Sequence, residues 1–300
     1  MSFFHRKAHT PQAVARLARH DDRGAVTRLL QSADRRYLTS AHAEVPDLLA
    51  ADPSSVIESD GRIVGAASFG WRASPVVWLR TLLLQSDLQV MPALRDLSAA
   101  LYPVLRADGI RLAAVTVDDW NDPWLRGPLG HLGYRPVVDV VGYEKRRMDR
   151  PSPGNQTVAI RPARPADLEG LLALDAACFP LPSIKGPELM RLALATSPCF
   201  LLAEFAREPV GYAFVTEHHD GRLLHLVRIA VAPAYQGRGV GVRLLAEVVD
   251  FAAARRVDFL TLNTQADNYG AQRLYEWFGF TRTGERQTVF TLEIPAAEGG

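Results

Sequence analysis

Lysine and net charge are both scarce in this 300-residue chain. Lysine occurs only at Lys7, Lys145 and Lys185, arginine supplies the rest of the 34 basic residues, and the formal net charge is +1. Binding to nucleic acid or another polyanion requires clustered lysine and arginine. The charge therefore argues against that function class, and no nucleic-acid partner is expected.

Cysteine is also rare, and Cys178 and Cys199 are the two examples. They stand outside the Cys/His spacings of zinc sites, and two thiols make no disulfide framework, which favours a reducing cytoplasm. The sequence has no run of about 20 apolar residues, the length that a membrane-spanning helix needs. Its opening residues, MSFFHRKAHT, lack the architecture of a signal peptide. We therefore expect a cytoplasmic protein without a metal site or a membrane partner.

Hydrophobic residues make up 48% of the chain, which is enough to form a core. The sequence divides into two similar halves. A segment at 149–157 that contains proline, glycine and serine has the composition of an exposed linker. On either side of it, landmarks recur at an offset of about 146 residues, which indicates an internal repeat. The matched segments are 16–22 with 161–167, 61–65 with 206–211, 78–80 with 226–228, and 133–134 with 279–280. We predict two domains of one fold, residues 1–150 and 157–300.

The pattern of the second half predicts an α+β fold, in which a mostly antiparallel mixed sheet is flanked by helices. Strands are expected over 158–161, 199–205, 210–217, 223–231, 258–263 and 288–294, and helices over 168–177, 240–255 and 269–277. Asp167 is the expected N-cap of the first helix, because its carboxylate can accept a hydrogen bond from an orphan backbone amide.

A glycine-rich loop, Gln236-Gly237-Arg238-Gly239-Val240-Gly241, separates a strand from the start of a helix. A helix N-terminus binds phosphate through unpaired N–H groups and a partial positive charge, and glycines let the backbone approach an anion. The loop lacks the Gly-Lys-Ser/Thr ending of a nucleotide P-loop, and its strand does not open a βαβ unit, which disfavours a dinucleotide fold. A tight turn without a ligand is the simpler alternative.

Two motifs resemble those of the GNAT superfamily of N-acetyltransferases. The first, over 228–241, is a strand followed by the family's Gln/Arg-x-x-Gly-x-Gly/Ala pattern at a helix start. The second, over 268–280, resembles the family's Asn-x-x-Ala-x-x-Leu-Tyr-x-x-x-Gly-Phe. The resemblance covers about residues 157–294, and with the repeat the whole chain is similar to tandem GNAT proteins.

The resemblance implies acetyl-CoA as the cofactor and a set of residues that bind it. Backbone groups of one strand would pair with the pantetheine arm like an added strand, and the amides of the glycine loop would hold the pyrophosphate. An asparagine would contact the cofactor where the last two core strands splay apart. The implied residues are Ile229, Ala230, Val231, Gln236, Gly237, Arg238, Gly239, Val240, Gly241 and Asn268.

Tyr275 matches the usual general acid of the family. A phenol with an unperturbed pKa of about 10 is protonated at pH 7 and can donate its proton to the departing thiolate. Tyr275 follows Asn268 by two helical turns, so both lie on one face of the helix. The alternative is that Tyr275 is a core aromatic with a packing role only.

His225 is the candidate general base, since an unperturbed imidazole pKa of about 6.5 suits that role at neutral pH. A chain of water molecules is an alternative, as are the neighbouring Glu217, His218 and His219. Cys178 is expected to be inert, because the resemblance implies direct transfer of the acetyl group to the amine.

The first half lacks counterparts of these features. The place of the glycine loop falls near Leu88, where there is no glycine and Pro92 has no N–H to offer an anion. The counterpart of Asn268 is Asn121, and that of Tyr275 is Pro128 or Leu129. We expect a degenerate domain that packs on the catalytic one and shapes its acceptor site.

Together these features predict an acyltransferase that moves an acetyl group from acetyl-CoA to a primary amine of a small molecule, a protein N-terminus or a lysine. The alternatives are a non-catalytic acyl-CoA-binding sensor or scaffold, and a hydroxyl- or thiol-directed acyltransferase on the same fold. Residues 179–191 and 217–221 are expected to contact the acceptor, and the acidic side chains of the second segment suit a cationic amine. The fold alone does not choose the acceptor.

Overall fold

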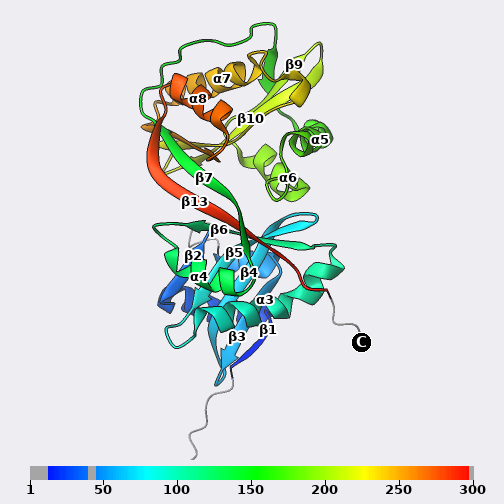
Figure 1. Ribbon diagram of the computed structural model, residues 1–300, viewed down its shortest axis with the longest axis vertical. Helices are drawn as coiled ribbons and strands as arrows, with labels where there is room; N and C mark the ends of the chain where they lie inside the picture. Colours follow the sequence, from blue (N-terminus) through cyan, green and yellow to red (C-terminus); the bar gives the residue numbers. More distant parts are fainter. Residues whose placement is uncertain (1–12, 40–44, 297–300) are drawn as a thin grey trace, which may run out of the picture.

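The computed structural model describes residues 13–39 and 45–296, and these form two halves built on the same plan (Figure 1). The elements of the first half are β1 (Val14–Leu17), η1 (His20–Asp22), α1 (Arg23–Ser32), β2 (Arg35–Leu38), α2 (Val45–Ala51), β3 (Ser54–Ser59), β4 (Arg62–Ala73), β5 (Val76–Leu84), α3 (Val90–Ala107), β6 (Leu112–Asp118), α4 (Pro123–His131) and β7 (Arg135–Lys145).

The second half repeats this order with one strand fewer before its hairpin. Its elements are β8 (Ala159–Pro162), η3 (Pro165–Asp167), α5 (Leu168–Cys178), α6 (Pro187–Thr196), β9 (Phe200–Phe205), β10 (Glu208–His218), β11 (Leu223–Val231), η4 (Pro233–Tyr235), α7 (Val240–Arg255), β12 (Phe259–Gln265), α8 (Tyr269–Trp277) and β13 (Thr281–Glu293). The predicted α+β class is confirmed, and each predicted element is present.

The strands of the described residues form one 13-stranded sheet in the order β1-β3-β4-β5-β6-β13-β7-β12-β11-β10-β9-β8, with β2 paired to β5 off this path. Each half contributes one parallel pair, β5 with β6 and β11 with β12. The other described pairs are antiparallel. This is the mostly antiparallel, mixed sheet that the pattern predicts.

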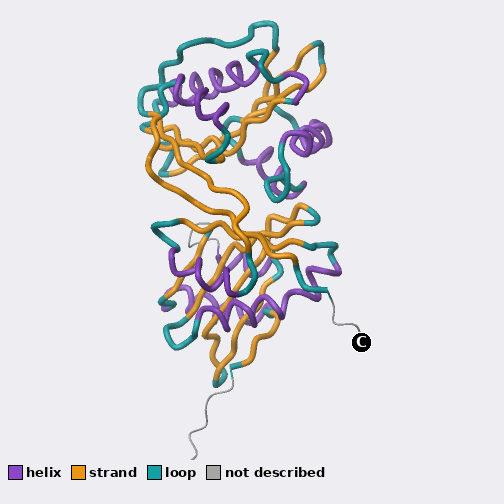
Figure 2. The backbone as a smooth tube through the Cα atoms, in the orientation of Figure 1, coloured by secondary structure: helices purple, strands orange, loops and turns teal. Residues whose placement is uncertain are grey.

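The two halves exchange their last strands. β7 leaves the first half to pair with β12, whereas β13 crosses back to pair with β6, and the two strands also pair with each other. Figures 1 and 2 show them running side by side between the halves. The predicted last strand, 288–294, is too short, because β13 begins at Thr281 and its residues 281, 282, 286 and 287 also pair with β7. The division at residues 150 and 157 stays a prediction, and the sheet runs across it.

Helices cover both faces of the sheet in each half. In the second half, α7 and α8 lie on one face and α5 and α6 on the other (Figure 1). α7 buries residues three and four apart, among them Leu244, Leu245 and Val248, which is the spacing of one helical face. Each such side chain contributes about 1.5–3 kcal/mol when fully buried. None of the helices in the described part of the chain is long and apolar enough to span a membrane.

Two local expectations differ from the structure. No helix is predicted between residues 177 and 240, but Pro187 is the first residue of α6, a position where a missing N–H costs nothing. Asp167 stands before α5 as expected but makes no capping bond to it. Its carboxylate instead accepts from the Arg164 amide at 2.7 Å and pairs with Arg161 at 2.8 Å.

Candidate active site

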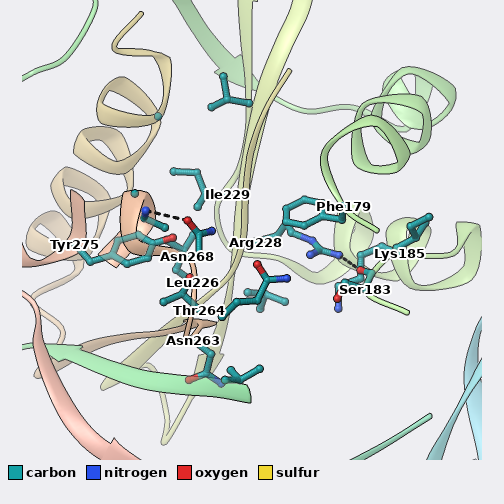
Figure 3. A pocket seen from close by; sticks show the side chains of 18 of the residues that line it. Phe179, Ser183, Lys185, Leu226, Arg228, Ile229, Asn263, Thr264, Asn268 and Tyr275 are labelled. Carbon is teal, nitrogen blue, oxygen red and sulfur yellow. Dashed lines mark hydrogen bonds between the residues drawn. The ribbon is translucent and has the colours of Figure 1, made fainter. Parts of the chain in front are cut away.

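A cleft of about 970 Å³ opens where β11 and β12 diverge. The two strands pair from Leu223 opposite Phe259 to Leu226 opposite Leu262, and no further pair joins them in the described residues. At the same point the register between β10 and β11 shifts, which leaves Val227 unmatched as a β-bulge. The divergence leaves one edge of β11 open to the cleft (Figure 3).

The open edge of β11 presents alternate backbone groups. The Ala232 amide bonds to the Val210 carbonyl on β10, and antiparallel pairing alternates along the strand. The backbone groups of Ala230 therefore face β10, whereas those of Ile229 and Val231 face the cleft. Ile229 and Val231 accordingly line it and Ala230 does not. Of the three residues expected to pair with a pantetheine arm, two are in position to do so.

The glycine loop forms the far end of the cleft. Gly237 and Gly239 have φ values of 73° and 77°, in the left-handed region that glycine adopts without strain, and Gly239 is the N-cap of α7. Gln236, Gly237, Gly239 and Gly241 all line the cleft. Successive amides in such a turn form an anion-binding concavity at a helix N-terminus.

Two other residues of the loop point elsewhere. The Arg238 guanidinium lies 5.4 Å from the centre of the Tyr235 ring, and Val240 is buried in the core beneath α7. Neither is among the residues that line the cleft. Their predicted contribution to cofactor binding therefore rests on their backbone amides.

Asn155, in the segment between the halves, braces the loop from outside. Its side-chain amide donates to the Arg238 carbonyl at 2.8 Å, and its backbone amide donates to the Gly239 carbonyl at 3.4 Å. The linker composition gave no sign of this contact, because the contact joins residues far apart in sequence. Part of the predicted exposed linker thus supports the candidate phosphate site.

Asn268 and Tyr275 lie together on the α8 side of the cleft (Figure 3). The Asn268 carboxamide oxygen accepts from the Ala271 amide at 3.1 Å and so caps α8. Tyr275 is 5% exposed and packs between the rings of Tyr143 and Phe280, with centres 6.1 and 6.0 Å away. Burial raises the pKa of Tyr275, so the phenol keeps its proton at neutral pH.

His225 lies on β11 but is not among the residues that line the cleft. Its Nδ1 is 2.9 Å from the Thr261 hydroxyl. Burial, followed by the charges of His218 and Lys185, lowers the pKa of His225 to about 4. The imidazole is therefore neutral at pH 7, and a proton that it accepts is held weakly.

Glu217, one of the alternative bases near His225, is engaged in an ion pair. Glu217 pairs with Arg255 at 3.0 Å, and residues 217–221 do not line the cleft. That segment lies outside the cleft lining, and its predicted contact with the acceptor stays a prediction. The Cys178 thiol donates to the Val231 carbonyl at 3.3 Å, and burial, then the charge of Asp175, raises its pKa. A raised pKa disfavours the thiolate, in keeping with the expected inert role.

The side of the cleft that faces the first half is built by both halves. Phe179, residues 182–186 and Leu189 line it from the second half, and Trp71, Trp78, Thr116 and Val140 line it from the first. The halves touch at Gly186, where an added Cβ would lie 2.0 Å from the Arg72 carbonyl oxygen on β4. Glycine is needed at this position because of that close approach.

In the first half the equivalent edge is occupied by the chain itself. β5 pairs with β6 from Val76 to Trp78, and β2 then pairs with residues 81–84, while β4 pairs along the opposite edge. β2 therefore covers the edge that β11 leaves open, and its Tyr37 is buried. Pro92 lies in the first turn of α3, where the second half has its glycine loop.

Comparison with known proteins identifies the fold. Residues 168–280 match the family model described as the acetyltransferase (GNAT) family. The C-terminal half carries a GNAT domain. Over 64 residues the chain is 47% identical to the N-alpha-acetyltransferase RimI of Mycobacterium tuberculosis, which covers 21% of this chain and 39% of that protein. Over 197 residues it is 30% identical to the mycothiol acetyltransferase of Streptomyces bingchenggensis, which covers 57% and 62%.

The tandem GNAT fold extends over both halves. A tandem GNAT protein from the clavulanic acid biosynthesis pathway superposes on 96% of this chain and 100% of its own, with a TM-score of 0.64 and 14% sequence identity. At that identity the likeness shows the fold alone. The chain spans less than half the length of several curated relatives that it matches.

Proposed function

We propose that this chain transfers an acetyl group from acetyl-CoA to a primary amine, at one site in the cleft between β11 and β12. The observation that carries the proposal is that three features share one cleft: the glycine loop at the start of α7, the open edge of β11, and Tyr275. Relatives named as N-terminal and mycothiol acetyltransferases support the same reaction class.

The residues of the cleft fit acetyl-CoA. The amides of Gly237 to Gly241 would hold the pyrophosphate, and the backbone groups of Ile229 and Val231 would bond the pantetheine arm. Acetyl-CoA would supply the activated acetyl group and the thiol that leaves. No aspartate or glutamate is among the residues that line the cleft, so its lining presents no carboxylate to repel the phosphates.

Tyr275 is the proposed acid, which donates the proton of its hydroxyl to the departing sulfur. The raised pKa keeps that proton on the hydroxyl at neutral pH until the thiolate forms beside it. The polar side of the phenol lies toward Asn268 (Figure 3), and the ring is fixed by its aromatic neighbours. This arrangement holds the donor in one position.

His225 is the proposed base for the acceptor amine, reached through a chain of water molecules because the imidazole does not line the cleft. Its Nδ1 is engaged with Thr261, which leaves Nε2 as the atom that accepts a proton. General bases contribute about 10²–10⁴-fold, and the low pKa places His225 at the lower end. We expect His225→Gln to lower kcat about 10²-fold with every acceptor. An unchanged kcat would assign the proton to water instead.

The first half is proposed to bind no acetyl-CoA, because its own β2 covers the equivalent edge and its α3 starts without a glycine loop. Its proposed role is to form the acceptor wall with Trp71 and Trp78. Isothermal titration of the full chain with acetyl-CoA should therefore give a stoichiometry of one. A value of two would contradict this assignment.

Two measurements together test the reaction. Acetyl-CoA at 100 times its dissociation constant should stabilise the chain by about 2.7 kcal/mol in a thermal shift, and free thiol should appear with some members of an amine library. A folded chain that shows no shift would overturn acetyl-CoA binding. A shift without thiol release from any amine would favour the sensor, and release with alcohols or thiols alone would favour the other acyltransferases.

A further inference from the structure

Lys185 places an ammonium group in the side of the cleft that faces the first half, without a counter-charge. The residue lies between α5 and α6, is partly buried and lines the cleft. Its backbone amide donates to an Asp175 carboxylate oxygen at 2.6 Å, which fixes the segment. Among the residues that the structure describes, its Nζ has no hydrogen bond or ion pair.

The nearby carboxylate, that of Asp175, already pairs with Arg228. Asp175 is fully buried, accepts from the Tyr212 hydroxyl and lies 3.1 Å from Nε of Arg228. Arg228 also donates to the Ser183 carbonyl and stacks 3.8 Å from the centre of the Phe179 ring. The charges of Asp175 and Arg228 therefore balance, and Lys185 supplies the net positive charge of this region.

The rest of the lining leaves that charge uncompensated. No aspartate or glutamate is found among the lining residues, and the wall from the first half is formed by Trp71, Trp78, Thr116 and Val140. An acceptor with only a protonated amine would meet like charge here and find no ion partner. An acceptor that also carries an anion would satisfy an ammonium that is otherwise unpaired.

We propose that Lys185 binds an anionic group of the acceptor, a carboxylate or a phosphate, so that the acceptor is an amine that bears such a group. This inference rests on the proposed acetyl transfer and names the substrate class for the same site. Figure 3 places Lys185, Ser183 and Arg228 on one side of the cleft and Tyr275 and Asn268 on the other. The anion would be held on the α5–α6 side, with the amine directed toward Tyr275.

Lys185 has the right protonation state for this role. Burial and the charge of Arg228 lower its pKa to about 8, against the opposing effect of Asp175. His225 is the other titratable group that its charge affects. The ammonium form still predominates at pH 7, so an anion is attracted at neutral pH.

The test compares matched acceptors in the thiol-release assay. Amino acids and aminoalkyl phosphates are paired with the corresponding carboxamides and neutral amino alcohols. We expect the anionic members to have kcat/KM values 10- to 100-fold higher. Lys185→Gln should remove that preference through KM, and Lys185→Arg should retain most of it. The charge-matched control Arg207→Gln, on the exposed turn between β9 and β10, should change neither set.

Two results would overturn the inference. One is equal turnover of anionic and neutral acceptors by the wild type. The other is an equal loss for both sets in Lys185→Gln, which would indicate a structural or general-base role instead. The preference between amino acids and aminoalkyl phosphates identifies which anion is bound.

A binding measurement separates this inference from the reaction itself. N-acetyl amino acids and their carboxamides are compared by thermal shift with wild type and Lys185→Gln. We expect the carboxylates alone to stabilise the wild type, and not the variant. If that pattern holds while no amine releases thiol, acetyl transfer fails and the anion site stands. If thiol is released but neither the carboxylates nor the phosphates show an advantage over their neutral partners, the anion site fails and acetyl transfer stands.

Discussion

Tyr275 is at once a core aromatic and a group of the cleft. It is 5% exposed, packs against two aromatic rings and still lines the cavity. The two interpretations of this residue are therefore compatible, because the ring is fixed by packing and the hydroxyl is the part that reacts. Removing the hydroxyl alone separates the packing role from the chemical one.

Tyr275→Phe should lower kcat by about 10²- to 10³-fold, within the usual range of a general acid. The ring packing is kept, so the thermal shift with acetyl-CoA should stay the same. Thiol release measures the first effect and melting with ligand the second. Tyr269→Phe, on the same helix and 64% exposed, is the control and should be silent. Wild-type turnover by Tyr275→Phe would exclude this residue as the acid.

His225 makes stability depend on pH. Its pKa falls from 6.5 to about 4 because burial favours the neutral imidazole. The folded state thus binds this proton less readily than the unfolded state, so its contribution is complete above pH 6.5 and is lost as the pH falls from 6.5 toward 4. By linkage that loss amounts to about 3 kcal/mol.

His225→Gln should reduce this acid sensitivity, because glutamine does not titrate and can still bond to Thr261. Urea unfolding of both proteins at pH 7 and pH 4.5 measures the difference. The wild type should lose more stability than the variant between these two values. Equal losses in both proteins would mean that the acid sensitivity arises from other groups.

At the residue scale, sequence could identify what is local in the chain. Asn268, Tyr275 and the glycines belong to contiguous motifs, and each of them lines the cleft. Trp78 gave no comparable signal, and Lys185 was indicated only by the predicted range 179–191, because this side of the cleft is assembled from segments more than a hundred residues apart. The position of Arg238 over Tyr235 likewise depends on a side-chain contact that a motif does not specify.

The turn before α7 needs glycine at residue 237 because of its backbone conformation, and not because a side chain would clash there. An added Cβ at Gly237 would meet nothing within 4 Å, but the φ angle of this residue is +73°. A non-glycine residue in that conformation costs about 1–2 kcal/mol. A substitution here should therefore distort the turn that presents the amides.

Gly237→Ala should lower stability by about 1 kcal/mol and weaken acetyl-CoA binding about tenfold. Gly170→Ala is the matched control, because that glycine lies within α5, has open space around it and no positive φ. The control should gain about 0.5–1 kcal/mol and bind normally. Urea unfolding and isothermal titration report the two effects. Normal binding by Gly237→Ala would show that the conformation of this residue is not required.

Asn155→Ala removes the side-chain hydrogen bond that supports the glycine loop and leaves the residues that line the cleft unchanged. We expect weaker acetyl-CoA binding with kcat unchanged at saturation, because Asn155 supports the Arg238 carbonyl at 2.8 Å and does not line the cleft. Gln156→Ala, in the same segment, is the control, since its side chain bonds only to neighbouring carbonyls. Equal affinity in both variants would remove the bracing role of Asn155.

At the element scale, periodicity and turn residues predicted the strands of the second half, including β11 from Leu223 to Val231, and helices α5, α7 and α8, but not α6. The length of β13 and the role of β2 were not predictable in the same way. Both strands are defined by partners in another part of the chain, since β13 pairs with β6 and β7 and β2 covers β5. Local pattern does not record which edge a strand will meet.

At the scale of the whole molecule, the two halves are joined by the exchanged strands as well as by the chain between them. β7 belongs in sequence to the first half but bonds to β12, and β13 belongs to the second half but bonds to β6. The side of the cleft that contains Trp71, Trp78 and Lys185 depends on this arrangement, because the two tryptophans and the lysine come from different halves. A break in the connecting segment should therefore leave the site assembled.

Insertion of a protease site after Pro151, followed by cleavage, tests this dependence. Residue 151 is exposed, and the cut would fall before the segment in which Asn155 braces the glycine loop. The two fragments should elute together on size exclusion and keep the thiol-release activity of the uncut chain, because the pairs of β7 and β13 remain intact. Separation of the fragments in native buffer would show that the covalent connection, and not the strand exchange, holds the halves together.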